Sequence, residues 1–192
     1  MRILDLFSGT HSLANAARPL GHEVVTLDNA LPADIECDFL TWDYTAYPPG
    51  HFDLIAASPP CAVWSNARMM NLGKLRLATG RPWTQAELDA DLKGPQGEQL
   101  IDRLRLVLTY FQPRWWWIEN PWLSKMRDYI TEQLDERFVR PPPFDLPGCY
   151  SDSANTSPLV FVLSAGSDPT KAFLAFAEES GMGKKTKAIS LG

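Results

Sequence analysis

Apolar residues fall into short continuous runs that alternate with longer segments of helical spacing. The runs predict buried strands over 2–7, 22–27, 52–57 and 114–119. The last of these contains Trp115-Trp116-Trp117-Ile118, an unbroken apolar stretch typical of a parallel strand covered on both faces. Apolar positions three and four residues apart predict helices over 11–20 and 96–111. A late strand over 158–163 and a last helix over 168–181 complete the pattern.

This alternation of strands and helices predicts an α/β fold with a doubly wound, mostly parallel sheet. A sheet of this kind has the Rossmann-like architecture. A chain of 192 residues has room for one such catalytic domain, over 1–192, and for no separate target-recognition domain. The stretches 68–95 and 140–156 show no clear periodicity.

A segment rich in polar residues, glycine or proline follows each of the four predicted strands 2–7, 22–27, 52–57 and 114–119. In open α/β sheets, ligands bind outside the carboxyl ends of the strands, so we expect these segments to face one crevice. They read Asp5-Leu6-Phe7-Ser8-Gly9-Thr10, Leu27-Asp28-Asn29, Ser58-Pro59-Pro60-Cys61 and Ile118-Glu119-Asn120-Pro121.

The first two segments favour a nucleoside site. A glycine turn after the first strand leaves space for a ligand, and Asp28 at the end of the second can accept hydrogen bonds from ribose hydroxyls. Phe7 is placed to stack on an adenine. A glycine turn and an aspartate are common in α/β proteins, so this signal is weak alone. The G-x-G-x-x-G pattern of dinucleotide sites is absent.

The third and fourth segments favour a reactive cysteine beside an acid. Two prolines stiffen the backbone before Cys61 and fix the direction of its side chain. A lone cysteine is usually a small buried apolar residue, and this interpretation suits Cys37 and Cys149. Three widely spaced cysteines and three histidines indicate neither a disulfide framework nor a metal site.

The charge distribution limits where a nucleic acid can bind. The net charge is -5, which argues against a general electrostatic attraction to DNA, because proteins that bind in this way are usually basic. Residues 62–86 carry no acid, however, and contain Arg68, Lys74, Arg76 and Arg81. We therefore expect 62–95 to be a DNA-facing loop insertion in which these cations meet phosphates; the alternative is a solvated loop.

Taken together, Asp5-Leu6-Phe7-Ser8-Gly9, Pro59-Pro60-Cys61 and Glu119-Asn120-Pro121 resemble the DNA (cytosine-5)-methyltransferase family, in the small form of phages and large viruses. The resemblance covers roughly residues 1–125. It implies S-adenosyl-L-methionine as cofactor and DNA as substrate, with the target base flipped into the pocket.

The resemblance also implies roles for single residues. Cys61 attacks carbon 6 of cytosine, Glu119 contacts N3, and Asn120 accompanies them in the motif. Asp28 takes the ribose, Asn29 lies beside the adenine, and Asp43 faces the adenine amino group. The remaining cofactor contacts are Phe7, Ser8, Gly9, Thr10 and Pro59.

Other functions stay open at this point. Ser58-Pro59-Pro60 also fits the first three places of the tetrad of exocyclic-amino methyltransferases, but their fourth place needs an aromatic residue and here is Cys61. The arginine pattern that the family carries after Glu-Asn-Pro is not evident, which favours a catalytically impaired S-adenosylmethionine- or DNA-binding module. An RNA substrate is a further alternative. We expect a cytoplasmic protein with no membrane segment and no metal.

Overall fold

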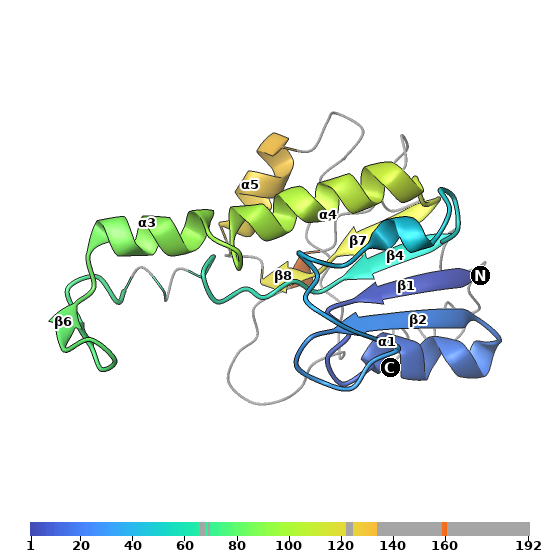
Figure 1. Ribbon diagram of the computed structural model, residues 1–192, viewed down its shortest axis with the longest axis horizontal. Coiled ribbons are helices and arrows are strands. Elements are labelled where there is room, and N and C mark those ends of the chain that lie inside the picture. Colours follow the sequence, from blue (N-terminus) through green and yellow to red (C-terminus); the bar gives the residue numbers. More distant parts are fainter. Residues whose placement is uncertain (66–67, 69, 122–124, 134–158, 161–192) are drawn as a thin grey trace, which may run out of the picture.

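The computed structural model of the chain describes residues 1–65, 68, 70–121, 125–133 and 159–160. Within them, five strands form one sheet in the order β3-β2-β1-β4-β7, and every pair is parallel (Figure 1). The strands are β1 (Arg2–Leu6), β2 (Glu23–Asp28), β3 (Ile35–Glu36), β4 (Leu54–Ala57) and β7 (Trp115–Ile118).

Helices and two small antiparallel pairs of strands surround this sheet. The helices are α1 (Ser12–Ala17), α3 (Gln85–Lys93), α4 (Glu98–Phe111) and α5 (Met126–Gln133), with the 3-10 helices η1 (Arg18–Leu20) and η2 (Tyr44–Ala46). The strands β5 (Leu75–Arg76) and β6 (Arg81–Pro82) form a hairpin, and β8 (Asn120–Pro121) pairs with β9 (Leu159–Val160).

Two apolar cores form because successive side chains of a strand point to opposite faces of the sheet. On one face, Leu4, Ile55 and Trp116 lie in register and share a core with α4. On the other, Ile3 and Leu54 form a core with the small side chains of α1. The predicted α/β fold with a mostly parallel sheet is therefore confirmed.

The regular elements expected from apolar spacing lie at the predicted places. The stretch 68–95, which has no clear periodicity, contains the β5–β6 hairpin and α3. Thr84 and Glu87 begin α3 with a reciprocal capping box, a local signal that does not depend on an apolar face. Strand β9 lies within the predicted strand 158–163, and the predicted last helix lies outside the described residues.

Strand order reverses beside β1. Strands β2 and β3 follow on one side of it, whereas β4 and β7 lie on the other. The connections after β1 and β4 therefore leave in opposite directions, which opens a crevice at the carboxyl ends of the strands.

Candidate active site

The carboxyl ends of β1, β4 and β7 surround a cavity of about 290 Å³, here called the β1–β7 cavity. The parallel hydrogen bonding continues one residue beyond the strands. The Ser58 amide donates to Leu6 O at 3.2 Å, and the Glu119 amide donates to Ala57 O at 2.8 Å. Ser58 Oγ can consequently donate to Glu119 Oε2 at 3.2 Å, and both side chains line the cavity.

A second cavity of about 220 Å³, the β2–β3 cavity, lies at the neighbouring strand ends. Its wall is largely apolar and includes Leu27, Phe39 and Pro60, with the polar side chains Asn29, Asp38 and Gln96. Such a wall, with few polar groups, suits a flat heterocycle.

Phe7 lines both cavities. Its φ of 60° is in the left-handed region, which bulky residues rarely adopt, and its ring meets Phe39 edge-on with centroids 4.9 Å apart. Backbone strain of this kind persists where the surrounding structure enforces it and is concentrated at ligand sites. The turn after β1 therefore holds Phe7 in a strained backbone conformation in which its ring lines both cavities.

Asp28 joins the first two motifs. Its Oδ2 accepts from the Gly9 amide at 2.9 Å, and its Oδ1 accepts from the amides of Ala30 and Leu31 at 2.8 and 3.0 Å. Burial alone would raise the pKa of Asp28, but these amides outweigh it and hold the pKa below its ordinary value. Gly9 has a φ of 51°, so the turn is formed at low cost by the residue that tolerates it. Asp28 is thus ionised and fixed.

Two buried polar groups in the β1–β7 cavity have oxygens without a hydrogen-bond partner among the described residues. They are Asp5 Oδ2 and Ser8 Oγ. Burial raises the pKa of Asp5 to about 6, and the charge of Glu119 adds to this effect, although His11, Arg18 and the Ala14 amide oppose it. Unsatisfied buried polar atoms are costly, so this wall is suited to a polar ligand.

We expect Asp5→Asn to stabilise the protein above pH 6. The pKa of Asp5 is about 6 in the folded state against 3.8 in the unfolded chain, so the folded state binds more protons between these values. The free energy of unfolding of the wild type therefore falls as pH rises from about 4 to 6, by at most roughly 3 kcal/mol. The Asp5→Asn variant has no titratable group at this position, so its free energy of unfolding does not fall for this reason. Urea titrations at pH 8 and below pH 4 measure the difference, which should vanish at the lower pH.

Asp89→Asn, on the exposed surface of α3, is the matched control. A wild type and an Asp5→Asn variant of equal stability at pH 8 would contradict the raised pKa.

Cys61 forms no disulfide among the described residues and is half-buried, directly after the exposed Pro60. Asn120, which is buried, donates from Nδ2 to Pro59 O at 3.3 Å and thus ties the Glu-Asn-Pro segment to the diproline. Pro60 lines the β2–β3 cavity, whereas Ala62 lines a third, α3–α4 cavity of about 450 Å³. The cysteine therefore stands between cavities and outside the apolar core.

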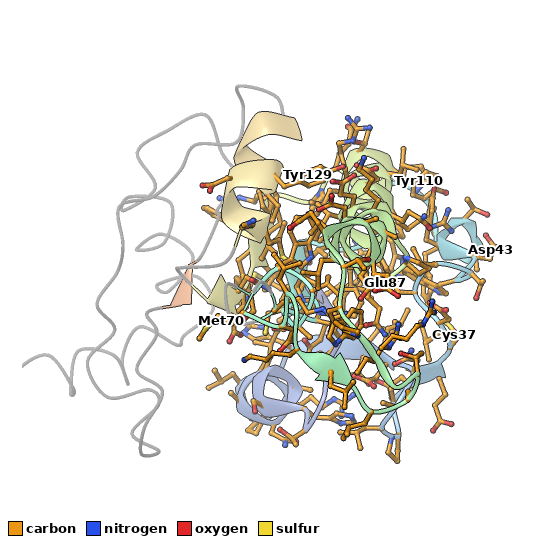
Figure 2. The ribbon with its side chains drawn as sticks, turned by 90° about the vertical axis from the view of Figure 1, so that its left-hand side faces the viewer. Cys37, Asp43, Met70, Glu87, Tyr110 and Tyr129 are labelled. Carbon is orange, nitrogen blue, oxygen red and sulfur yellow. The ribbon has the colours of Figure 1, made fainter. Side chains whose placement is uncertain are left out.

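The carboxylate that lines the β2–β3 cavity is Asp38, whereas the resemblance suggests Asp43 for this role. Asp43 is exposed, caps η2 through Thr45, and does not line either of these cavities. Figure 2 shows it at the outer edge of the molecule. Asp38 lines the β2–β3 cavity instead. Asp38 follows the end of β3, a position at which a site residue is expected. Because β3 has only two residues and no recognisable apolar pattern, the sequence does not reveal this strand end.

The other predicted cofactor contacts divide between the two cavities. Ser8, Gly9 and Thr10 line the β1–β7 cavity, and Asn29 lines the β2–β3 cavity. Pro59, in contrast, is buried and lines neither cavity.

The four cations expected to meet phosphates have two different environments. The guanidinium groups of Arg68 and Arg76 both lie over the Trp83 ring, each 4.2 Å from its centroid, and they form ion pairs with Asp91 and Glu87, respectively. In contrast, Lys74 and Arg81 are exposed.

Among the described residues, no helix is long and apolar enough to cross a membrane. No group of three or more histidine, cysteine or acidic side chains there is placed to hold a metal ion.

Comparison with known proteins gives a match to a viral protein over 69% of the chain. The chain is 41% identical over 134 residues to a Frog virus 3 (isolate Goorha) protein named probable DNA (cytosine-5)-methyltransferase. The match covers 69% of this chain and 59% of the viral protein. The chain thus spans less than two thirds of that relative. No family model matches the chain.

Parts of two far larger proteins are also similar. Human dynein axonemal heavy chain 3 is 34% identical over 124 residues, which is 64% of this chain and 3% of the dynein. Mouse dynein axonemal heavy chain 12 is 54% identical over 66 residues, 34% of this chain and 2% of the dynein. So small a share of a dynein carries no functional argument. The viral match agrees with the three sequence motifs and supports the assignment of the matched residues to the DNA (cytosine-5)-methyltransferase family.

Proposed function

We propose that the protein transfers a methyl group from S-adenosyl-L-methionine to carbon 5 of cytosine in DNA, through a covalent adduct with Cys61. The observation that carries this proposal is the linkage of the two motifs: Asn120 binds the carbonyl of Pro59, and Ser58 binds Glu119. These hydrogen bonds join the loop that carries Cys61 to the segment that carries Glu119, at the ends of the adjacent strands β4 and β7. The similarity to a viral protein named for this activity supports the same proposal.

The two cavities fit the proposed cofactor. The β2–β3 cavity has the apolar wall an adenine needs, with Phe7 for stacking, and Asp38 is the nearer acceptor for its amino group. Asp28 lines neither cavity, but it binds the amide of Gly9, which lines the β1–β7 cavity, and its remaining lone pair can accept from a ribose hydroxyl. The unpartnered Asp5 and Ser8 oxygens in the β1–β7 cavity suit the charged amino-acid end. In this assignment the sheet is of the Rossmann-like methyltransferase type.

The chain's own groups account for the remaining chemistry. Carbon 5 of cytosine is a poor nucleophile, so the Cys61 thiolate first adds to carbon 6, and the ring becomes an enamine. Glu119 protonates N3 and removes the negative charge that this addition creates. The bound cofactor supplies an electrophilic methyl group to carbon 5. Loss of the carbon 5 proton then expels Cys61 and restores the ring.

The target atom lies inside the base stack, so the base must be flipped into the pocket, at a cost of a few kcal/mol. Segment 62–95 is the proposed DNA-facing insertion. Because Arg68 and Arg76 are engaged with carboxylates, Lys74 and Arg81 are its better candidates for phosphate contacts.

A duplex with 5-fluorocytosine tests this function directly. Fluorine at carbon 5 cannot leave as a proton does, so the adduct with Cys61 should persist after methyl transfer. With labelled cofactor, we expect a protein–DNA band that survives denaturing electrophoresis, and none with unmodified cytosine. Methylation of an exocyclic amino group without trapping would favour an amino methyltransferase. Cofactor binding without methylation would favour an impaired binding module.

A further inference from the structure

The loop that carries Cys61 is held at both of its ends. Before the cysteine, Asn120 donates to the carbonyl of the buried Pro59. After it, the Trp64 amide donates to Cys61 O at 3.1 Å and closes a tight turn. Pro60 is exposed and Cys61 is only half-buried, so the core packs less closely around them than around the ends of the loop. The position of the thiol therefore depends on how firmly these two ends are fixed.

Trp64 anchors the second end in the main apolar core. Its side chain is 2% exposed and belongs to the core cluster that also contains Leu104 of α4 and Met126 and Ile130 of α5. Its main-chain carbonyl accepts from the Lys125 amide at 3.1 Å, immediately before α5 begins. The end of the cysteine loop is thus attached to the segment that leads into α5.

Tyr129 of α5 connects this anchor to α4. Its ring lies against that of Trp64, with centroids 5.3 Å apart and planes inclined by 45°. Its hydroxyl group donates to Asp102 Oδ1 on α4 at 3.0 Å. Figure 1 shows α5 lying beside α4. Burial and the Asp102 acceptor raise the pKa of Tyr129 to about 12, so the hydroxyl group keeps its proton and donates at neutral pH.

The orientation of the Trp64 ring is set by packing. Its indole N–H is buried and has no hydrogen-bond partner among the described residues. Within the same part of the chain, the aromatic ring that pairs with it is that of Tyr129. A change at Tyr129 is therefore transmitted to Trp64, and through the turn at Trp64 to the cysteine.

We infer that Tyr129, held by Asp102, is a positioning residue for Cys61: by fixing Trp64 it fixes the direction in which the thiol points. Tyr129 and Asp102 lie outside the three sequence motifs and line none of the three cavities, so they act on the nucleophile and not on the cofactor. This inference rests on the proposed function and deepens it. A thiolate displaced by about 1 Å from its line of attack can lose roughly 10²-fold in rate.

Alkylation of Cys61 by iodoacetamide tests the inference without methyl transfer. Mass spectrometry of the cysteine peptides gives the rate at Cys61 and, in the same sample, the rate at Cys37. Tyr129→Phe keeps the ring but removes the hydroxyl group, so the loop is less firmly held and Cys61 should react about fivefold faster, the effect of one hydrogen bond. Cys37 lines the β2–β3 cavity and lies well away from Tyr129 (Figure 2), so its rate should not change.

Two matched variants separate positioning from a general loss of stability. Asp102→Asn retains an acceptor oxygen for the hydroxyl group and should keep the wild-type rate at Cys61, whereas Asp102→Ala should match Tyr129→Phe. Tyr110→Phe removes a similar hydrogen bond, to Tyr47 O at 3.0 Å, near the other end of α4. This variant should leave the rate at Cys61 unchanged.

Methylation gives the second readout. In single turnover, Tyr129→Phe should lower the rate about fivefold and leave the affinity for the cofactor unchanged. An unchanged alkylation rate at Cys61 in this variant would overturn the inference, as would a parallel rise at Cys37, which indicates general loosening. Alkylation needs neither DNA nor cofactor, so its result does not depend on the trapping assay. A trapped adduct together with a Cys61 that is insensitive to Tyr129→Phe would reject this inference and leave the proposed function intact.

Discussion

Cys61→Ala is expected to abolish methyl transfer while leaving the affinity for S-adenosyl-L-methionine unchanged. The thiolate makes carbon 5 nucleophilic, so without it the ring has no route to the enamine. The cysteine does not line the two cavities assigned to the cofactor, and its main-chain carbonyl accepts from the Trp64 amide whatever the side chain is. Transfer of labelled methyl to DNA and calorimetric titration of the cofactor measure the two effects separately.

Two further variants isolate the sulfur atom. Cys61→Ser keeps the size of the side chain and replaces the thiol with a much poorer nucleophile, so it should also be inactive. Cys149→Ala removes a cysteine that belongs to none of the motifs and should keep the wild-type rate. Full transfer by Cys61→Ala would eliminate the covalent mechanism. Loss of cofactor binding in the same variant would instead indicate a structural role for this residue.

The sequence predicts most of the parallel sheet because its strands, apart from β3, are short and largely continuous apolar runs. Trp115 to Ile118 is buried almost throughout, as expected for a parallel strand between two layers, and α4 has an apolar face along its length. The motifs at the strand ends could also be predicted to converge, since parallel strands deliver their carboxyl ends to one edge.

The missed elements are those whose stability does not come from an apolar pattern. Helix α3 buries only Leu88 and begins with a capping box, and the hairpin is held by turn hydrogen bonds and by the Trp83 stack. Strand β3 extends over two residues, so the carboxylate after it, Asp38, is not evident. The pairing of Arg68 and Arg76 with acids on α3 likewise depends on tertiary structure, which charge counting along the chain does not reveal.

Glu119→Gln is expected to lower kcat by about 10²-fold with little change in KM for DNA. Glutamine retains the size of the side chain and its hydrogen-bonding capacity, so the base still binds. It cannot transfer a proton to N3, however, and the charge created by thiolate addition is then unrelieved. The substitution therefore weakens the stabilisation of the transition state and not the binding of DNA, as expected for an interaction that Glu119 makes only in the transition state. Single-turnover methylation at saturating cofactor measures the chemical step without product release.

The hydrogen bond from Ser58 gives this prediction a second test. Ser58 Oγ donates to Glu119 Oε2 and fixes the carboxyl group against the end of β4. Ser58→Ala frees it to rotate, so we expect a several-fold loss in kcat, smaller than that of Glu119→Gln and not additive with it, because both changes affect one group. Glu23→Gln, an exposed residue of β2, is the control. Fully additive losses in the double variant would show that Ser58 acts elsewhere, and an unchanged rate in Glu119→Gln would remove the acid from the mechanism.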